Sequence, residues 1–317
     1  MRRIVLVLAA VIAASPAVFS QTPQSTTPDE YTLNISKLKD KDPLARRSAA
    51  EALGALRDQR AIGDLTTALR DNNPLVRQAV VDALGMLRAN SAIKPIGEAL
   101  VTDKEAQVRQ SAAIALGYIG SDGGQDYLSK GLEDKVSGVR YSAAASLGQI
   151  RSPEAVAALS KFLADPDAGM RRSVLVALDR AEDSSPLPSV RNMLGDTDPV
   201  VRAMAAKFAG KFKDAESRAA LKEMLGDKDK RAVVNAAYAL GRLGDTSGFQ
   251  AVSKIVKSEQ DVTIKTLSVE ALEAIGGSQS VSLLKEMLND PDEYVKNSAR
   301  YALIRMRVPL DDKTKKK

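Results

Sequence analysis

The chain has 317 residues, of which 44% are hydrophobic and only 4% aromatic, and it contains no Cys, His or Trp. Without Cys and His it can form no disulfide, no thiolate or imidazole metal site and no catalytic group that depends on either residue. The formal net charge is +6, but residues 21–310 carry 40 basic and 38 acidic side chains. This near balance predicts that nucleic acid is not a partner.

The first segment, residues 1–20, has the pattern of a secretory signal peptide. Arg2 and Arg3 precede an apolar run over residues 4–14, and small residues lead up to Gln21. The run is shorter than the about 20 residues that a membrane-spanning helix needs. We therefore expect cleavage and export, to a periplasmic or secreted location and without stable membrane insertion. The alternative is an uncleaved anchor.

Beyond this segment, one unit of 31 or 32 residues recurs nine times. In the second copy it runs from Asp71 through Arg77 to Gly85 and beyond. Recurrence at a fixed period is typical of stacked repeat architectures. The acidic residues that open the copies lie at positions 40, 71, 103, 134, 165, 196, 227, 259 and 290.

Each copy predicts two helices. The first carries apolar residues on one helical face, as at Ile62, Leu65 and Leu69. The second begins at Asp or Asn, often followed by Pro, as at Asn73-Pro74, and these residues cap and open a helix. A helical hairpin cannot bury its apolar face alone, so neighbouring hairpins must stack.

These patterns divide the chain into four parts. The first part is the signal segment, residues 1–20, and it is followed by a polar linker over residues 21–28. Residues 29–308 form an all-α solenoid of nine stacked helical hairpins, and residues 309–317 form a basic disordered tail. A glycine near the end of the second helix permits close backbone approach or a left-handed cap. Asp179 replaces it in the fifth copy, so we expect a kink over residues 179–190.

The unit D-x-x-x-x-V-R-x-x-A-x-x-A-L-G resembles HEAT repeats, and its short period is similar to the phycobilisome-lyase type of HEAT-like repeat. The resemblance covers residues 29–308. It implies a superhelix in which the second helices line a concave face. It is specific for the fold and carries little information about function.

An Arg recurs near the start of the second helix, in step with the opening acids. We expect each Arg to hydrogen-bond an acid or turn carbonyls of its own or the next repeat, as the HEAT resemblance also implies. The alternative is a basic ladder for an acidic ligand. Pairs of acids such as Asp196 and Asp198 are interpreted as helix caps and not as metal ligands. The structural ladder comprises Arg46, Arg77, Arg109, Arg140, Arg171 and Arg202 with Asp71, Asp103, Asp134, Asp165 and Asp196.

A second set of residues lies on the second helices, opposite their buried stripe. They project together because they are four and eight positions apart, and acids are absent from them in the middle copies. Tyr and Arg are enriched at binding hot spots. We expect a groove for an acidic or extended protein segment, against the alternative of a solvated face that also packs between repeats. The candidates are Ile114, Tyr118, Tyr141, Arg172, Val176, Arg180, Lys211, Tyr238 and Arg242.

The sequence thus predicts an exported, non-enzymatic HEAT-repeat scaffold that binds a protein or peptide, with no catalytic residue, metal or cofactor. One alternative is an enzyme-accessory or bilin-lyase-like factor, against which the signal segment and the lack of His and Cys argue. Another is a structural envelope component that associates with itself.

Overall fold

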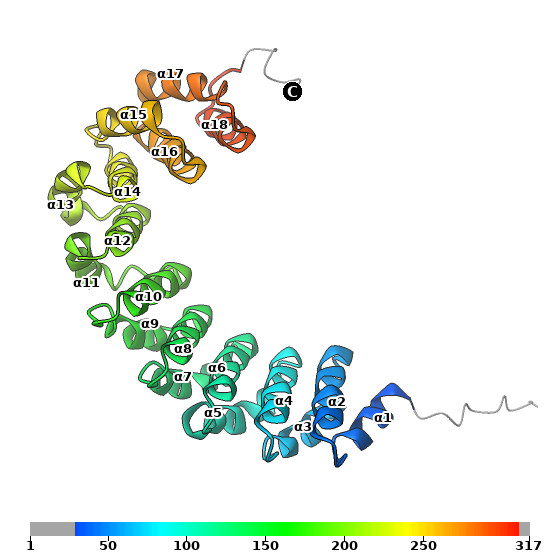
Figure 1. The fold of residues 1–317 in the computed structure, drawn as a ribbon. Helices are drawn as coiled ribbons and strands as arrows, with labels where there is room; N and C mark the ends of the chain where they lie inside the picture. Colours follow the sequence, from blue (N-terminus) through cyan, green and yellow to red (C-terminus); the bar gives the residue numbers. More distant parts are fainter. Residues whose placement is uncertain (1–28, 311–317) are drawn as a thin grey trace, which may run out of the picture.

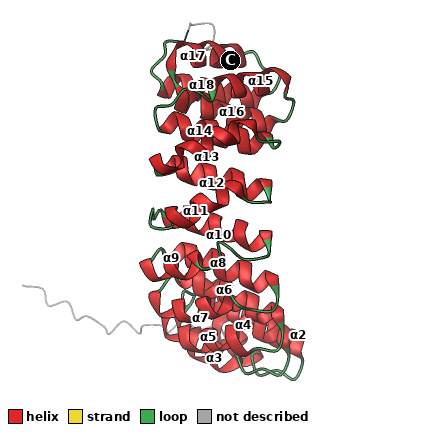
Figure 2. Cartoon of the chain, turned by 90° about the vertical axis from the view of Figure 1, so that its left-hand side faces the viewer, coloured by secondary structure: helices red, strands yellow, loops and turns green. Residues whose placement is uncertain are grey.

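The computed structural model describes residues 29–310, and the structural statements below refer to that part of the chain. It contains eighteen α-helices and no strand. The helices form a crescent in which one row lies on the concave side and the other on the convex side (Figure 1). Seen at right angles, the hairpins stack in one column with loops along both edges (Figure 2). The prediction of an all-α solenoid of nine hairpins is confirmed.

The first helix of each hairpin belongs to the convex row and the second to the concave row. Short 3₁₀ turns precede or follow several convex-row helices. The convex row comprises α1 (Glu30–Lys37), α3 (Ile62–Ala68), α5 (Ile93–Thr102), α7 (Gln125–Gly131), α9 (Pro153–Ser160), α11 (Leu187–Asn192), α13 (Arg218–Glu223), α15 (Phe249–Ser258) and α17 (Gly277–Met287). The concave row comprises α2 (Pro43–Leu56), α4 (Pro74–Met86), α6 (Ala106–Ile119), α8 (Ser137–Ile150), α10 (Ala168–Ala181), α12 (Pro199–Lys211), α14 (Lys230–Arg242), α16 (Val262–Ile275) and α18 (Glu293–Arg305).

Acidic and amide side chains start most of the concave-row helices. Asp198 caps α12 by accepting hydrogen bonds from the backbone amides of Val200 and Val201, each at 3.0 Å. The first acid of the pair, Asp196, accepts the amide of Asp198 at 2.8 Å. The paired acids therefore fold the turn and cap the helix, as the sequence indicated.

Every concave-row helix is followed by a residue with a positive φ, at the same place in all nine repeats, and at Arg57, Gly120, Arg151 and Glu182 this residue is in the left-handed conformation. The glycines inside the helices do not adopt it, so the left-handed cap lies three residues beyond the recurrent glycine. Most of these positions hold an L-residue, for which this conformation costs about 1 kcal/mol. The residues with positive φ at this place are Arg57, Arg88, Gly120, Arg151, Glu182, Lys213, Gly244, Gly276 and Arg307, of which Gly276 has an extended ψ of −164°.

The recurrent glycine instead sets the distance between neighbouring concave-row helices. A Cβ on Gly148 of α8 would lie 2.7 Å from the Cα of Ala177 in α10, closer than side chains can pack. Gly210 of α12 has the same relation to Ala239 of α14. These contacts let adjacent backbones touch, which narrows the concave side relative to the convex side.

The fifth repeat, in which we expected a kink over residues 179–190, departs from this arrangement. Asp179 stands in place of the glycine, and Phe208 stands in place of the small residue that faces it. As a result α10 and α12 approach each other less closely than any other adjacent pair in the concave row. The pair with the second least close approach, α16 and α18, also lacks the glycine, because Glu273 stands in its place. The crescent itself continues through this point without a break (Figure 1).

Between the two rows lies an aliphatic, Ala-rich core. One group of buried side chains extends from Leu38 to Leu240 and a second from Val233 to Leu303. Helix α14 contributes to both groups, so it joins them. The largest fully buried side chain is Phe208, at the junction of α10 and α12.

We expect the variant Arg88→Gly to be more stable than the wild type by about 0.5 kcal/mol, because glycine removes the cost of the left-handed conformation but loses more entropy on folding. Arg88 is exposed and has a φ of 48°. The matched change Gly120→Ala, at a φ of 68°, should destabilise by about 1 kcal/mol. Urea unfolding followed by circular dichroism measures both. Equal stability of all three proteins would contradict this account.

Candidate functional site

The predicted ladder of Arg side chains ties each repeat to the next. Arg109 of α6 donates from Nε and Nη2 to the two carboxylate oxygens of Asp134, at 2.6 and 3.0 Å. Its Nη1 donates to the backbone carbonyl of Asp103 at 2.8 Å. One guanidinium thus holds its own turn and the next one, and both partners are at least 90% buried.

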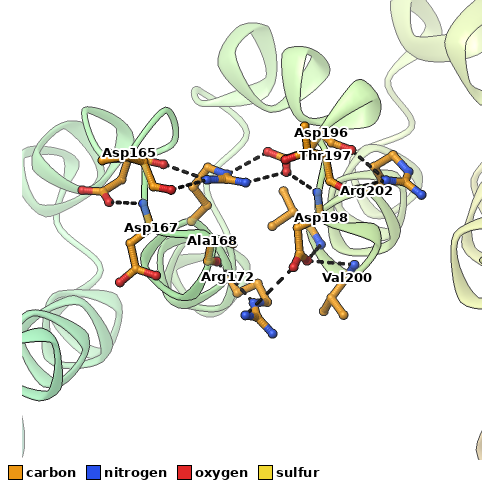
Figure 3. A network of polar contacts seen from close by, with 12 residues as sticks. Asp165, Asp167, Ala168, Arg172, Asp196, Thr197, Asp198, Val200 and Arg202 are labelled. Carbon is orange, nitrogen blue, oxygen red and sulfur yellow. Dashed lines mark hydrogen bonds and ion pairs between the residues drawn. The ribbon is translucent and has the colours of Figure 1, made fainter.

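The same contacts recur along the stack. Figure 3 shows Arg202 of α12 with its guanidinium toward the carbonyl oxygens of Asp196 and Thr197, at 2.7 and 3.2 Å. Bidentate Arg–carboxylate pairs have a fixed geometry, so they set the register between hairpins. The pairs are Arg46–Asp71, Arg77–Asp103, Arg109–Asp134, Arg171–Asp196 and Arg202–Asp227.

One predicted pair does not form. Arg140 does not bind Asp165; it donates from Nη2 to Asp167 at 3.0 Å, and its buried Nε has no hydrogen-bond partner among the described residues. The reason is Tyr141, whose hydroxyl donates to the same Asp167 oxygen at 2.5 Å and holds this carboxylate beside Arg140. Asp165 still belongs to the ladder through its backbone, because its carbonyl accepts from Arg171 Nη1 at 2.8 Å, while its carboxylate has no Arg partner from the preceding repeat.

After α12 the ladder continues with lysines. Val233 occupies the Arg position of the seventh copy, and Lys230 reaches Glu259 instead, at 2.7 Å. In the eighth copy Lys265 binds Asp290 at 2.8 Å with both side chains about nine-tenths buried. Sequence analysis missed Lys230 because it lies three positions before the recurrent Arg.

The ladder carboxylates titrate below their ordinary range. Burial acts to raise the pKa of Asp134, but hydrogen bonds from Arg109 and from the amide of Val136 outweigh it, so the net pKa is lowered. The pKa of Asp71 is lowered chiefly by its hydrogen bonds from Arg46. These carboxylates are therefore charged in the folded protein under neutral conditions.

Three of the predicted binding residues come together on the concave face between α6 and α8. Ile114 and Tyr118 of α6 are 39% and 56% exposed, and with Tyr141 of α8 they line a hollow of about 360 Å³. Its polar lining includes Gln110 and Gln149, and none of its lining residues is charged. This hollow suits an apolar or aromatic side chain.

Tyr141 is only partly available there. Its ring is half-buried, and its hydroxyl is engaged with Asp167, which together with burial raises the pKa of Tyr141. Tyr141 therefore forms a wall of the hollow, while Ile114 and Tyr118 offer most of the exposed surface.

Further along the concave face, Val176 of α10 lines a smaller slot between α10 and α12. The slot holds about 120 Å³, and its lining also includes Asp179, Met204, Lys207 and Phe208. Neither Arg172 nor Arg180 lines it. Arg172 donates from Nε to the carbonyl of Ala168 at 3.2 Å and lies 4.0 Å from Asp198 (Figure 3).

Lys211 is engaged within the protein. Its Nζ binds Asp179 Oδ1 at 2.9 Å, across the junction of α10 and α12. The same pairing occurs where the glycine is next replaced, since Glu273 binds Arg305 at 2.6 Å. An acid at the glycine position thus recruits a base from the following helix, which sequence analysis did not recognise.

Tyr238 and Arg242 of α14 line a third hollow of about 430 Å³, together with Glu270, Glu273 and Arg305. Unlike the first hollow, this one has acidic side chains in its lining. One of them, Glu270 of α16, binds Lys207 of α12 at 3.2 Å, across α14.

The structure therefore distributes six of the nine predicted residues over three hollows along one concave wall, and Arg172, Arg180 and Lys211 line none of these three. Lys207, Met204 and Phe208 belong to the middle one and were not predicted. The sequence did contain a signal that could have identified these residues. At this one junction the recurrent glycine is replaced by Asp179 and the small residue that faces it by Phe208. The proposed binding role of the set stays a prediction.

Within residues 29–310, no cluster of three or more acidic, His or Cys side chains is placed to hold a metal ion. None of the helices in the described part is both long and apolar enough to cross a membrane. The predicted signal segment and most of the basic tail lie outside the described residues.

Comparison with known proteins agrees with the fold. A family model for HEAT repeats matches residues 32–116, 93–179, 163–238 and 234–304. A search of curated proteins found no match. Among solved structures, the Escherichia coli protein YibA has a TM-score of 0.55 and 20% identity, over 81% of this chain and 100% of that one.

Two further structures are similar at lower scores. The complex of CpcE and CpcF of phycocyanin lyase from a Nostoc species has a TM-score of 0.40 at 20% identity, over 93% of this chain and 100% of that one. Human deoxyhypusine hydroxylase has a TM-score of 0.34 at 20% identity, over 88% and 96%. At these identities the similarity concerns the fold alone.

We expect Arg109→Ala to lower the free energy of unfolding by roughly 3 kcal/mol near neutral pH, because it leaves Asp134 buried without its partner. Since the folded pKa of Asp134 is lowered, the pair stabilises the wild type above the unfolded pKa of about 3.9. That stability is lost as the pH falls through the folded pKa, so wild type and variant should converge on acidification. Urea unfolding at about pH 7 and at about pH 2, below the unfolded pKa of Asp134, measures this.

The control for this change is Arg47→Ala. Arg47 pairs with Glu51 on the surface of α2, where both side chains are about half exposed. Its loss should change stability by less than about 0.5 kcal/mol. A difference between Arg109→Ala and wild type that stays constant over this pH range would rule out the role given to Asp134.

Proposed function

Because the chain belongs to the HEAT-repeat family, we propose that it is a non-enzymatic scaffold that binds a protein partner along the concave face of its second helices. Stacked repeats present an extended concave surface of this kind. The observation that carries the proposal is the uncharged hollow between α6 and α8, with Ile114 and Tyr118 exposed at its mouth.

The distribution of apolar side chains on the concave wall supports this role. Met86, Ile114, Tyr118 and Val176 are each between 39% and 56% exposed on successive or nearby helices of the same row. Exposed apolar and aromatic side chains that gather on one face are typical of interaction sites. The lack of Cys and His in the whole sequence supports a binding role over a catalytic one.

We propose in addition that the protein is exported. The support is the basic and then apolar pattern of residues 1–20, followed by the polar segment 21–28. A chain without Cys is also suited to an oxidising compartment, since no thiol can be oxidised there.

The binding role is tested by affinity capture from the envelope extract of the native organism, with residues 21–317 as bait and mass spectrometry as readout. Ile114→Ser with Tyr118→Ser should reduce enrichment of the partner about tenfold or more, because two exposed anchors are lost. Both positions are solvent-facing, so the helical circular dichroism and the melting temperature should not change.

The matched control is Leu75→Ser with Val101→Ser. These residues are 48% and 44% exposed but lie outside the hollow, and Val101 is on the convex row. This bait should capture the partner as well as the wild type does. Equal enrichment by all three baits would place the site elsewhere, and no enrichment by the wild type would count against a protein-binding scaffold.

Export is tested by expression of the full chain in a bacterial host, cell fractionation and intact mass measurement. We expect the protein in the periplasm, beginning at Gln21, because the apolar segment is too short to remain as a stable anchor. A full-length chain in the membrane fraction would support the anchor alternative, and a full-length chain in the cytoplasm would contradict export.

A further inference from the structure

The junction between α10 and α12 is built unlike the others in the concave row. Elsewhere in the middle of the stack a glycine meets an alanine or serine of the next helix, and the backbones touch. Here Asp179 and Phe208 occupy these two places, and the helices stand further apart. The slot of about 120 Å³ between them follows from this pair of substitutions.

The interior of the slot is apolar. Its apolar lining consists of the buried Phe208 (2% exposed) and Leu175, the half-buried Met204, and Val176, which is 47% exposed. A cavity of about 150 Å³ with such a lining holds benzene. A slot of about 120 Å³ therefore fits one aliphatic side chain of the size of Leu or Ile.

The surroundings of the slot are basic. The concave side of α10 and α12 carries four cations, Arg172, Arg180, Lys207 and Lys211, against one acid of these two helices that lines the slot, Asp179.

Three of these cations are paired within the protein. Asp179 binds Lys211, Glu270 binds Lys207, and Arg172 lies 4.0 Å from Asp198. The Lys207–Glu270 pair is about half exposed at both ends, so a carboxylate from a partner can replace Glu270 there at little cost.

We propose that this slot is a specificity pocket for an acidic protein segment, which inserts one Leu- or Ile-sized side chain and places flanking carboxylates on Lys207, Arg172 and Arg180. The inference rests on the proposed binding function and names the chemistry of the partner. Glu270 occupies the position of one partner carboxylate when the groove is empty.

The test uses the protein from residue 21 to 317 with fluorescent peptides of about twelve residues. One is rich in Glu with a central Leu, the second carries Ser in place of Leu, and the third keeps Leu but has Lys in place of Glu. Fluorescence anisotropy gives the affinities, and ¹³C-methyl NMR of Met204, assigned from Met204→Leu, reports on the slot itself.

The Glu-rich Leu peptide should bind roughly tenfold or more tightly than its Ser counterpart, since burial of a Leu side chain supplies at least this factor. It should shift the Met204 methyl signal. The Lys-rich peptide should bind more weakly than both. Glu270→Gln should tighten binding of both Glu-rich peptides, because it removes the internal competitor for Lys207.

The double variant Asp179→Gly with Phe208→Ala restores the contact seen at the other junctions and should close the slot. It should then bind the Leu and Ser peptides equally while its helicity is retained. As a check that does not alter packing, Lys207→Gln should weaken both Glu-rich peptides and leave their ratio unchanged.

Equal binding of the Leu and Ser peptides to the wild type, or an unmoved Met204 signal on binding, would overturn the proposal, as would no binding up to about 1 mM. These outcomes leave the capture experiment with Ile114→Ser and Tyr118→Ser unaffected. Loss of capture in that variant would show a scaffold that recognises its partner without the slot.

Discussion

The close contact between a glycine in one concave-row helix and a small residue in the next controls the shape of this protein. At Gly148 the backbone of α8 meets Ala177 so closely that no Cβ fits between them. Because such a contact recurs at six of the eight junctions of the concave row, the stack narrows on that side and curves. The concave face, and therefore the surface available to a partner, depends on this single contact repeated along the chain.

The Arg ladder acts at the other end of the same helices. Each bidentate pair, such as Arg109–Asp134, joins the start of one concave-row helix to the turn before the next. The glycine contact fixes the spacing near the helix ends and the ladder fixes the register near the helix starts. Two constraints at opposite ends of a helix leave little freedom to rotate, which explains how an aliphatic core without Trp and with few aromatic residues specifies one superhelix.

The fold could be predicted from the sequence because its information is local and repeated nine times. The spacing of Ile62, Leu65 and Leu69 and the cap at Asn73 recur in phase, so each copy supports the others. The candidate site was less predictable. Sequence position placed Lys211 with the binding residues, whereas in the structure it pairs with Asp179. The spacing along one helix could not reveal this, because it does not show which acid of the neighbouring helix lies within reach. The left-handed residues were missed for a related reason, since Arg88 and Arg151 carry no glycine signal.

The exception at α10 and α12 shows how a repeat array can gain a specific site without a new structural element. Replacing glycine by Asp179 removes a packing contact and adds a charge, and Phe208 refills only part of the space. The charge is then balanced by Lys211 of the next helix, so the junction is held together by an ion pair in place of backbone contact. The same exchange at Glu273 and Arg305 produces the third hollow near the end of the stack. Where the contact between glycine and a small residue is absent, an ion pair at the surface maintains the connection between hairpins. The space that opens between the helices becomes available to a ligand side chain.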